Sequence, residues 1–226
     1  DAPAKLAKFE IGALQVFHFE NFDGGSDNGW VHAQVATQDD WQRGIPAGLA
    51  GDPGSAYSGA NIWANDLGLS GFNGLYQPNV NNYLRSPNIN LAGSNGAKLI
   101  YQRWLTVEEG IYDQAEIRVN GNKVWNNPAN GNLVDSAWTK HEVDISAFDG
   151  QNVQIEYRLI TDGGLEFGGW NIDDLAIQTQ SQSPSVGLPT NYGSGTTGST
   201  IPTIDSHGQV PFLGNNDFSV ALKNAP

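Results

Sequence analysis

Short runs of alternating apolar and polar residues, separated by turn residues, constrain the fold of this chain most strongly. Each run has the length and the two-residue period of a β-strand, and none repeats its apolar residues with helical spacing. The chain contains 28 glycines and only 11 lysines and arginines in total, which is typical of turn-rich, helix-poor proteins. The predicted strand regions are residues 14–22, 29–36, 60–66, 83–91, 97–107, 113–125, 138–145, 152–161 and 170–180.

This pattern predicts an all-β fold in which two antiparallel sheets pack as a sandwich. Residues 1–12 have the composition of a linker, and residues 13–180 form the predicted sandwich. Residues 181–226 begin with a Gly/Ser/Thr/Pro-rich segment and contain one further strand pattern, at 217–222, so we expect a linker and a truncated second β-module. Inside 113–125, the pair Asn120-Gly121 predicts a hairpin turn.

Composition excludes several functions. The net charge is −13, and binding to nucleic acids or to anionic membranes needs clustered lysine and arginine, so neither is expected. The chain has no cysteine, which excludes disulfides, thiol catalysis and zinc–thiolate sites. No apolar run is long enough to span a membrane. Since the chain also has no methionine, we expect that it is a piece of a longer, processed protein.

Two adjacent carboxylates interrupt the apolar run near residue 173. If Ile172 points into the core, strict alternation also buries Asp174, at a cost of several kcal/mol for an unpaired charge. A β-bulge at Asp173 and Asp174, or a bound cation, would relieve this conflict. Far upstream, Glu20 and Asp23 close an apolar strand, so we expect the two ends of the sandwich to meet there, around calcium.

A second acidic group lies in the predicted turn after residue 107. Glu108 and Glu109 are adjacent, and Asp113 follows. Paired carboxylates catalyse glycoside hydrolysis when they face each other across a cleft, so a glycan-acting hydrolase that uses Glu109 is one alternative function. Adjacent residues on a turn usually point apart into water, and the sequence has neither an HExxH nor a GxSxG motif. No catalytic residue is therefore assigned.

The seven tryptophans divide into two groups. Four lie within strand patterns and are expected in the core: Trp30, Trp63, Trp104 and Trp170. Three lie at loops or strand ends, where an exposed ring could stack on a sugar or on a peptide side chain: Trp41, Trp125 and Trp138. For these three the alternative is packing over the ends of the sandwich.

An ordered series of motifs resembles a known kind of module. The motifs are FENFDGGSDNGW, DDWQRGIP, GDPGSAYSG, NIWANDLG, YLRSPNINL, WTKHEVDIS and GGWNIDDLAI. Together they resemble the jelly-roll modules that follow the catalytic domains of secreted bacterial peptidases of the immune-inhibitor-A and subtilisin-like types, and more distantly the MAM domain and calcium-binding carbohydrate-binding jelly rolls. The resemblance covers residues 16–177.

The resemblance implies a structural calcium ion held by Glu20 and by Asp173 or Asp174, with Asp23 and Asp66 as further donors. It also implies a non-catalytic, calcium-stabilised accessory module of a secreted bacterial protein, so an extracellular location is expected. Its partner would be a protein or polysaccharide ligand, or the catalytic domain of the parent peptidase. A carbohydrate-binding module is an alternative within the same fold.

Overall fold

The computed structural model describes residues 14–179, 203–205 and 221–223. The chain divides into two compact units, Asp1–Pro184 and Ser185–Pro226. The predicted linker 1–12 and most of the predicted strand 217–222 lie outside the described residues. Within the described residues, no helix is long and apolar enough to cross a membrane.

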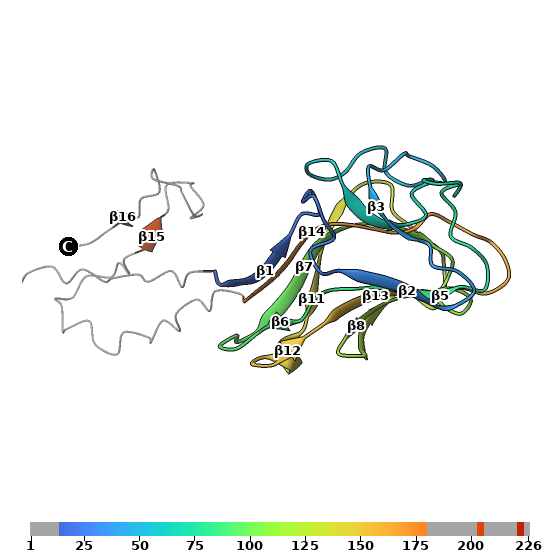
Figure 1. The fold of residues 1–226 in the computed structure, drawn as a ribbon. Helices are drawn as coiled ribbons and strands as arrows, with labels where there is room; N and C mark the ends of the chain where they lie inside the picture. The colour runs from blue at the N-terminus through green and yellow to red at the C-terminus, as the bar shows by residue number, and fades with distance from the viewer. Residues whose placement is uncertain (1–13, 180–202, 206–220, 224–226) are drawn as a thin grey trace, which may run out of the picture. The chain divides into compact units, whose positions relative to one another are not determined.

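The first unit is an antiparallel β-sandwich, as predicted (Figure 1). One sheet has seven strands, and its main path runs in the order β10-β7-β14-β4-β3, with β1 on β14 and β11 on β7. Its strands are β1 (Val16–Glu20), β3 (Trp41–Gly44), β4 (Ile62–Asn65), β7 (Ala97–Val107), β10 (Leu133–Val134), β11 (Thr139–Asp144) and β14 (Gly169–Thr179).

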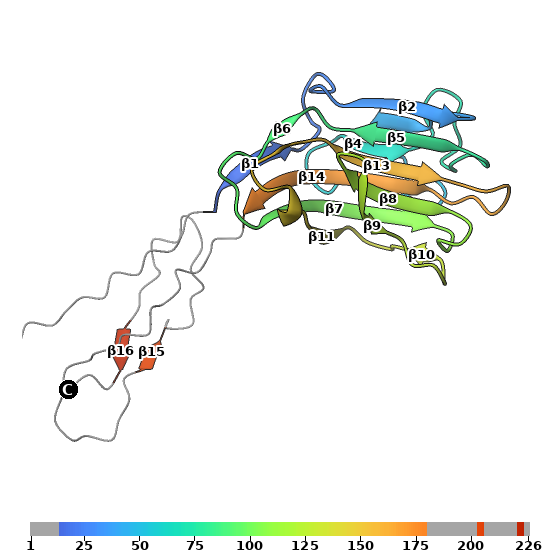
Figure 2. The same cartoon turned by 90° about the horizontal axis from the view of Figure 1, so that it is seen from below.

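The second sheet has five strands in the order β2-β5-β13-β8-β9. They are β2 (Val31–Ala36), β5 (Asn81–Arg85), β8 (Gln114–Val119), β9 (Asn122–Asn126) and β13 (Ile155–Ile160). From β4 to β8 the chain alternates between the two sheets, and β13 and β14 again lie in different sheets. This repeated crossing is the jelly-roll arrangement, and Figure 2 shows β7 and β14 side by side in the first sheet.

Short elements complete the described structure. β6 (Ile89–Asn90) pairs with β12 (Asn152–Val153), and a 3-10 helix spans Ser146–Phe148. In the second unit, β15 (Thr203–Asp205) pairs antiparallel with β16 (Ala221–Lys223).

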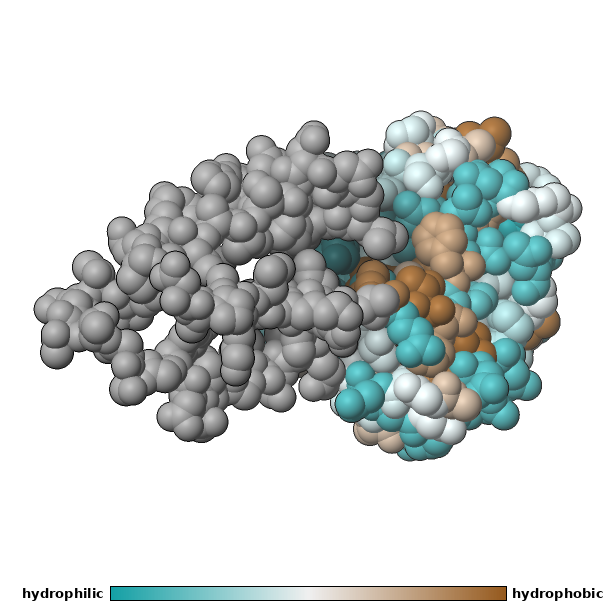
Figure 3. All heavy atoms as spheres, turned by 90° about the vertical axis from the view of Figure 1, so that its left-hand side faces the viewer, coloured by the Kyte–Doolittle hydropathy of each residue, from teal (hydrophilic) through white to brown (hydrophobic). Residues whose placement is uncertain are grey.

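The core lies between the two sheets and is rich in aromatic rings. Trp63, Tyr101, Tyr157 and Trp170 are at most 1% exposed. The Tyr157 ring packs edge-on against both Tyr101 and Trp170. Figure 3 shows the side of the first unit that faces left in Figure 1, where hydrophilic residues surround a group of hydrophobic ones. Of the tryptophans predicted in the core, only Trp104 is partly exposed, and its Nε1–H donates to the carbonyl of Gly51.

Two strand predictions need correction. The segment 37–59, which lies between two predicted strand regions and was not predicted to contain a strand, contains β3, which pairs with β4. The region predicted as one strand, 83–91, is two strands, because Pro87 lacks a backbone N–H and β5 ends at Arg85. The predicted hairpin is confirmed, since Asn120 and Gly121 both have positive φ, 49° and 80°, between β8 and β9.

Candidate functional site

The adjacent carboxylates of β14 lie at a β-bulge. The register of β14 against β7 shifts between Asp173 and Ala176, and Asp174 has a φ of 44°. On its other side, β14 pairs with β4 at Asn171 and Ile172 and with β1 from Leu175 onward. Asp173 and Asp174 therefore lie between the part of β14 that pairs with β4 and the part that pairs with β1. The bulge predicted from the sequence is confirmed.

The bulge directs both carboxylates toward the loop that precedes β4. The backbone N–H groups of Tyr57 and Ser58 each donate to Asp173 Oδ2 at 3.0 Å, and the N–H of Asp174 donates to Asp173 Oδ1 at 2.8 Å. The Ser58 hydroxyl donates to Asp174 Oδ1 at 2.8 Å. Since Asp173 is completely buried, these hydrogen bonds replace the water that its carboxylate loses.

Asp23, which follows β1 near the start of the described chain, binds the same loop. Its Oδ1 accepts hydrogen bonds from the N–H groups of Ala60 (2.8 Å) and Asn61 (2.9 Å). Its Oδ2 would lie 1.5 Å from a Cβ atom at Gly59, which has a φ of 56°. Only glycine at position 59 permits this close approach.

Glu20 ends β1 beside the bulge. It pairs with Leu175, the residue after Asp174. Its Oε1 accepts from the N–H of Phe22 at 3.0 Å, and its Oε2 accepts from Asn28 Nδ2 at 2.8 Å. Glu20 is 7% exposed, and its pairing with Leu175 places its backbone next to the bulge.

We call this region the acidic corner: Glu20, Asp23, Asp173 and Asp174 around the loop 57–61. Burial raises the pKa of Asp173 to about 6, despite its hydrogen bonds to backbone N–H groups. The N–H groups of Asn61 and Ala60 lower the pKa of Asp23. The corner therefore concentrates negative charge, part of which is shielded from water.

The donor chemistry of the acidic corner fits a hard cation. Asp174 accepts a hydrogen bond through Oδ1, which leaves its Oδ2 without a partner among the described residues, and carboxylate oxygens are preferred ligands of calcium. Oxygen atoms from three acidic side chains lie within 4.8 Å of one another at only one place in the described part of the chain, which is Glu108, Asp113 and Asp162. The carboxylate oxygens of Glu20, Asp23, Asp173 and Asp174 do not converge in this way, so a calcium ion at the corner would depend on backbone carbonyls and water for most of its ligands.

Asp66 does not belong to the acidic corner. It follows β4, whereas the loop 57–61 precedes this four-residue strand, and a strand rises about 3.3 Å per residue. Its Oδ1 accepts from the N–H groups of Gly68 (3.0 Å) and Gly74 (2.9 Å), and its Oδ2 accepts from that of Asn73 (3.4 Å). Asp66 therefore stabilises a different loop, residues 68–74, through hydrogen bonds to its backbone.

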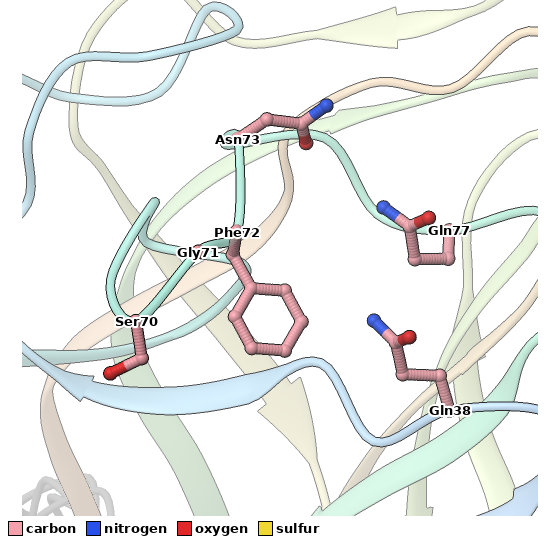
Figure 4. Close-up of a pocket in the computed structure, with 6 residues that line it drawn as sticks. All are labelled: Gln38, Ser70, Gly71, Phe72, Asn73 and Gln77. Carbon is pink, nitrogen blue, oxygen red and sulfur yellow. The ribbon is translucent and has the colours of Figure 1, made fainter.

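That loop forms one wall of a pocket with a volume of about 410 Å³. Its lining residues are Gln38, Ser70, Gly71, Phe72, Asn73 and Gln77. The Phe72 ring and the amides of Gln38 and Gln77 point into a shared space (Figure 4). The sequence does not predict this pocket, because the 70–77 segment shows only an ordinary loop composition.

The second acidic group is only partly a solvated turn. Asp113 is completely buried, and it accepts hydrogen bonds from the Tyr76 hydroxyl (2.6 Å) and from the N–H of Asp162 (2.8 Å). Burial raises the pKa of Asp113. Glu109 accepts from the N–H of Gly131 at 2.7 Å. Asp113 and Glu109 therefore hold loops together, whereas the sequence predicted that acidic side chains on this turn point into water.

The three tryptophans predicted to stack on a ligand have different surroundings. Trp41 is 2% exposed, so it offers no ring face in this conformation. Trp125 is half-buried between Trp170 and the Arg103 guanidinium, which lies 5.5 Å from its ring centre. Trp138 is half-buried, and its Nε1–H donates to the Ser55 carbonyl. Ligand stacking stays a prediction for Trp125 and Trp138.

The fold and the acidic corner define a jelly-roll β-sandwich module. No known family model matches the chain. The chain is homologous to part of Bacillopeptidase F of Bacillus subtilis, with 30% identity over 159 residues, which is 70% of this chain and 10% of that protein. It is also similar to part of the pre-pro-metalloprotease PrtV of Vibrio cholerae, with 32% identity over 99 residues, 38% of this chain and 11% of that protein. It thus spans about a tenth of these relatives.

Similar solved structures include an adhesin domain and a carbohydrate-binding module. The K3 cleaved adhesin domain of Lys-gingipain from Porphyromonas gingivalis has a TM-score of 0.48 and 14% identity, and covers 74% of this chain and 100% of that one. A family 35 carbohydrate-binding module from Clostridium thermocellum has a TM-score of 0.41 and 17% identity, and covers 74% of this chain and 99% of that one.

Proposed function

We propose that residues 14–179 form a non-catalytic binding module that accompanies a peptidase in a larger extracellular protein. The homology supports this proposal, because the matched segment makes up only about a tenth of Bacillopeptidase F and of PrtV. A segment of that size in two peptidases has the proportions of an accessory domain rather than of the whole enzyme. Its partner would be a protein or polysaccharide ligand, or the catalytic domain itself.

Calcium would stabilise this module at the acidic corner. Glu20, Asp23 and Asp174 would supply carboxylate oxygens, and Asp173 would hold the loop 57–61 in place through its backbone hydrogen bonds. When bound, the cation would neutralise carboxylates that come from both ends of the sandwich. Calcium sites of extracellular modules are filled at millimolar concentrations, so this role would require a location outside the cell.

The surroundings of the buried carboxylates favour binding over catalysis. Asp173 and Asp113 are both engaged by backbone N–H groups, as expected for carboxylates with a structural task. The rival function, a glycan-acting hydrolase that uses Glu109, predicts turnover that Glu109→Gln abolishes. Incubating the chain with a panel of polysaccharides and with casein tests this rival, and hydrolysis lost in Glu109→Gln would overturn the non-catalytic assignment.

Calorimetric titration of the whole 226-residue chain with calcium chloride tests the metal part of the proposal. We expect saturable binding that Glu20→Ala or Asp174→Ala weakens at least tenfold. Glu142→Gln removes an exposed carboxylate that contacts only lysines in the described structure, so it should leave calcium binding unchanged. Equal binding by all variants would show that calcium binds elsewhere.

A further inference from the structure

The pocket beside Phe72 has a lining without any charged side chain. The six residues that line the pocket are two glutamines, an asparagine, a serine, a glycine and a phenylalanine. This uncharged lining contrasts with the net charge of −13 of the whole chain. Gln38 Nε2 donates to Asp40 Oδ1, Gln77 Nε2 donates to the Leu75 carbonyl, and Asn73 Oδ1 accepts from the N–H of Leu75. Gln38 Oε1, Gln77 Oε1 and Asn73 Nδ2 have no hydrogen-bond partner among the described residues. The pocket therefore offers both acceptors and donors to a ligand.

Two buried carboxylates behind the lining hold its walls in place. Asp40 is completely buried; its Oδ1 accepts from Gln38 Nε2 at 2.8 Å, and its Oδ2 accepts from the N–H of Gln77 at 3.2 Å. Asp66, also completely buried, fixes the opposite wall through the N–H groups of Asn73 and Gly74. The N–H of Asp66 donates to the Asp40 carbonyl at 2.7 Å, which joins the two walls. Because the walls are already ordered, a ligand would pay little for ordering them.

We propose that this pocket binds a neutral saccharide, an inference that rests on the proposed function as a binding module. Sugar hydroxyls both donate and accept hydrogen bonds, as the amides of Gln38, Asn73 and Gln77 require. The Phe72 ring supplies an apolar surface against which a sugar ring can pack. The volume of about 410 Å³ lies within the range of roughly 300 to 1,000 Å³ that is common for small-ligand sites.

Charge and size argue against other ligand classes. An anionic ligand would find no cation in the lining and would approach the buried carboxylates Asp40 and Asp66. A folded protein partner needs about 800 Å² of surface on each side, which corresponds to about 20–30 residues. This pocket is lined by only six residues, so it is too small for such a partner. An extended peptide is the remaining competitor, because its amides also donate and accept, and the experiment includes one.

The test is calorimetric titration of the whole 226-residue chain with cellohexaose, xylohexaose, mannohexaose and chitohexaose. An oligogalacturonate is the charged probe, and a Gly-Ser-Asn peptide of similar length is the peptide probe. We expect at least one neutral hexasaccharide to bind, and both the oligogalacturonate and the peptide not to compete. Phe72→Ala should weaken binding about tenfold or more, as expected for loss of an aromatic contact, whereas Phe72→Tyr should retain it.

Two further variants keep the test interpretable. Asn73→Asp introduces a charge into the lining and should also weaken binding, while Tyr112→Ala removes an aromatic side chain that is 46% exposed elsewhere and should not. Thermal melting of each variant shows whether it is folded. Binding that Phe72→Ala and Asn73→Asp leave intact would overturn this pocket as the site, and so would binding of none of the neutral sugars or of the peptide alone. The calcium titration decides the stabilising site separately, so its outcome and that of the pocket are distinguishable.

Discussion

Asp173 Oδ2 lies 3.0 Å from the backbone nitrogen of Ser58, a residue 115 positions earlier in the chain. This hydrogen bond joins the last strand of the sandwich to the loop before β4. Asp23 binds the same loop at Ala60 and Asn61. Side chains from the beginning and the end of the sandwich thus share one loop, and the predictions below follow from this arrangement and from the buried carboxylates around it.

Asp173→Ala should destabilise the module strongly even without a metal. The substitution removes the acceptor of three backbone N–H groups, those of Tyr57, Ser58 and Asp174. An unsatisfied donor costs about 1–3 kcal/mol when it is fully buried, but Tyr57 is 51% exposed and water can reach part of these groups, so we expect the free energy of unfolding in EDTA to fall by about 2 kcal/mol in total. Urea unfolding followed by tryptophan fluorescence measures this change.

Asp173→Asn serves as the matched comparison, because its carbonyl oxygen can still accept from Tyr57 and Ser58. It should cost clearly less than Asp173→Ala, about 1 kcal/mol. Glu142→Ala, at an exposed position with surface ion pairs only, should change stability by less than about 1 kcal/mol. An Asp173→Ala variant as stable as Glu142→Ala would show that the loop 57–61 does not depend on this carboxylate.

Stability should fall between pH 5 and pH 8 because of Asp52. This residue is 8% exposed, and burial raises its pKa from 3.8 to about 8, although Asn171 Nδ2 donates to its Oδ1 at 2.7 Å. Since the folded state binds the proton more tightly than the unfolded state, the stabilisation is complete below pH 4 and is lost as the pH rises toward 8.

Asp52→Asn provides the measurement, because asparagine does not titrate and its carbonyl can still accept from Asn171. Thermal midpoints of both proteins at pH 5, 7 and 9 should show a larger fall for the unmodified chain than for Asp52→Asn. The two proteins contain the same other titrating groups, so the difference between them reports on Asp52. Parallel midpoints across this range would contradict the raised pKa.

Gly74→Ala should be much more costly than Gly71→Ala. Both glycines have positive φ, 88° and 97°, so any other residue is strained at either position. A Cβ at Gly74 would lie 2.5 Å from Leu49 Cβ, whereas a Cβ at Gly71 would meet nothing within 4 Å. We expect Gly71→Ala to cost about 1 kcal/mol and Gly74→Ala about 1–3 kcal/mol more, measured by urea unfolding. Equal losses in the free energy of unfolding for the two variants would show that the loop 70–74 can shift to accommodate the added Cβ at position 74.

Alternation and turn residues predicted most of the sandwich. β7 spans the predicted residues, 97–107, because apolar residues mark a strand buried in the centre of a sheet. The Asn120-Gly121 turn was predictable because a two-residue hairpin needs two residues with positive φ. β3 was missed because Trp41–Gly44 is short, lies among glycine, proline and aspartate residues, and is fixed by pairing with β4.

The acidic corner was only partly predictable. The conflict between Ile172 and the adjacent aspartates indicated a bulge, and the bulge is present. Asp66 looks equivalent to the other aspartates in the sequence, and only the fold separates it from them. The pocket depends on hydrogen bonds from Asp40 and Asp66 across long sequence intervals, and such contacts leave no local pattern.

The most direct test of the calcium-stabilised corner is thermal melting of the whole chain in 2 mM calcium chloride and again in EDTA. We predict a calcium-dependent rise in the midpoint, because a ligand that binds only the folded state stabilises it. Glu20→Ala and Asp174→Ala should each abolish this rise, while Asp66→Asn, which lies outside the corner, should lower both midpoints and keep the difference. Identical curves with calcium and EDTA would contradict the account, and Glu20, Asp23 and Asp174 would then be hydrogen-bonding groups alone.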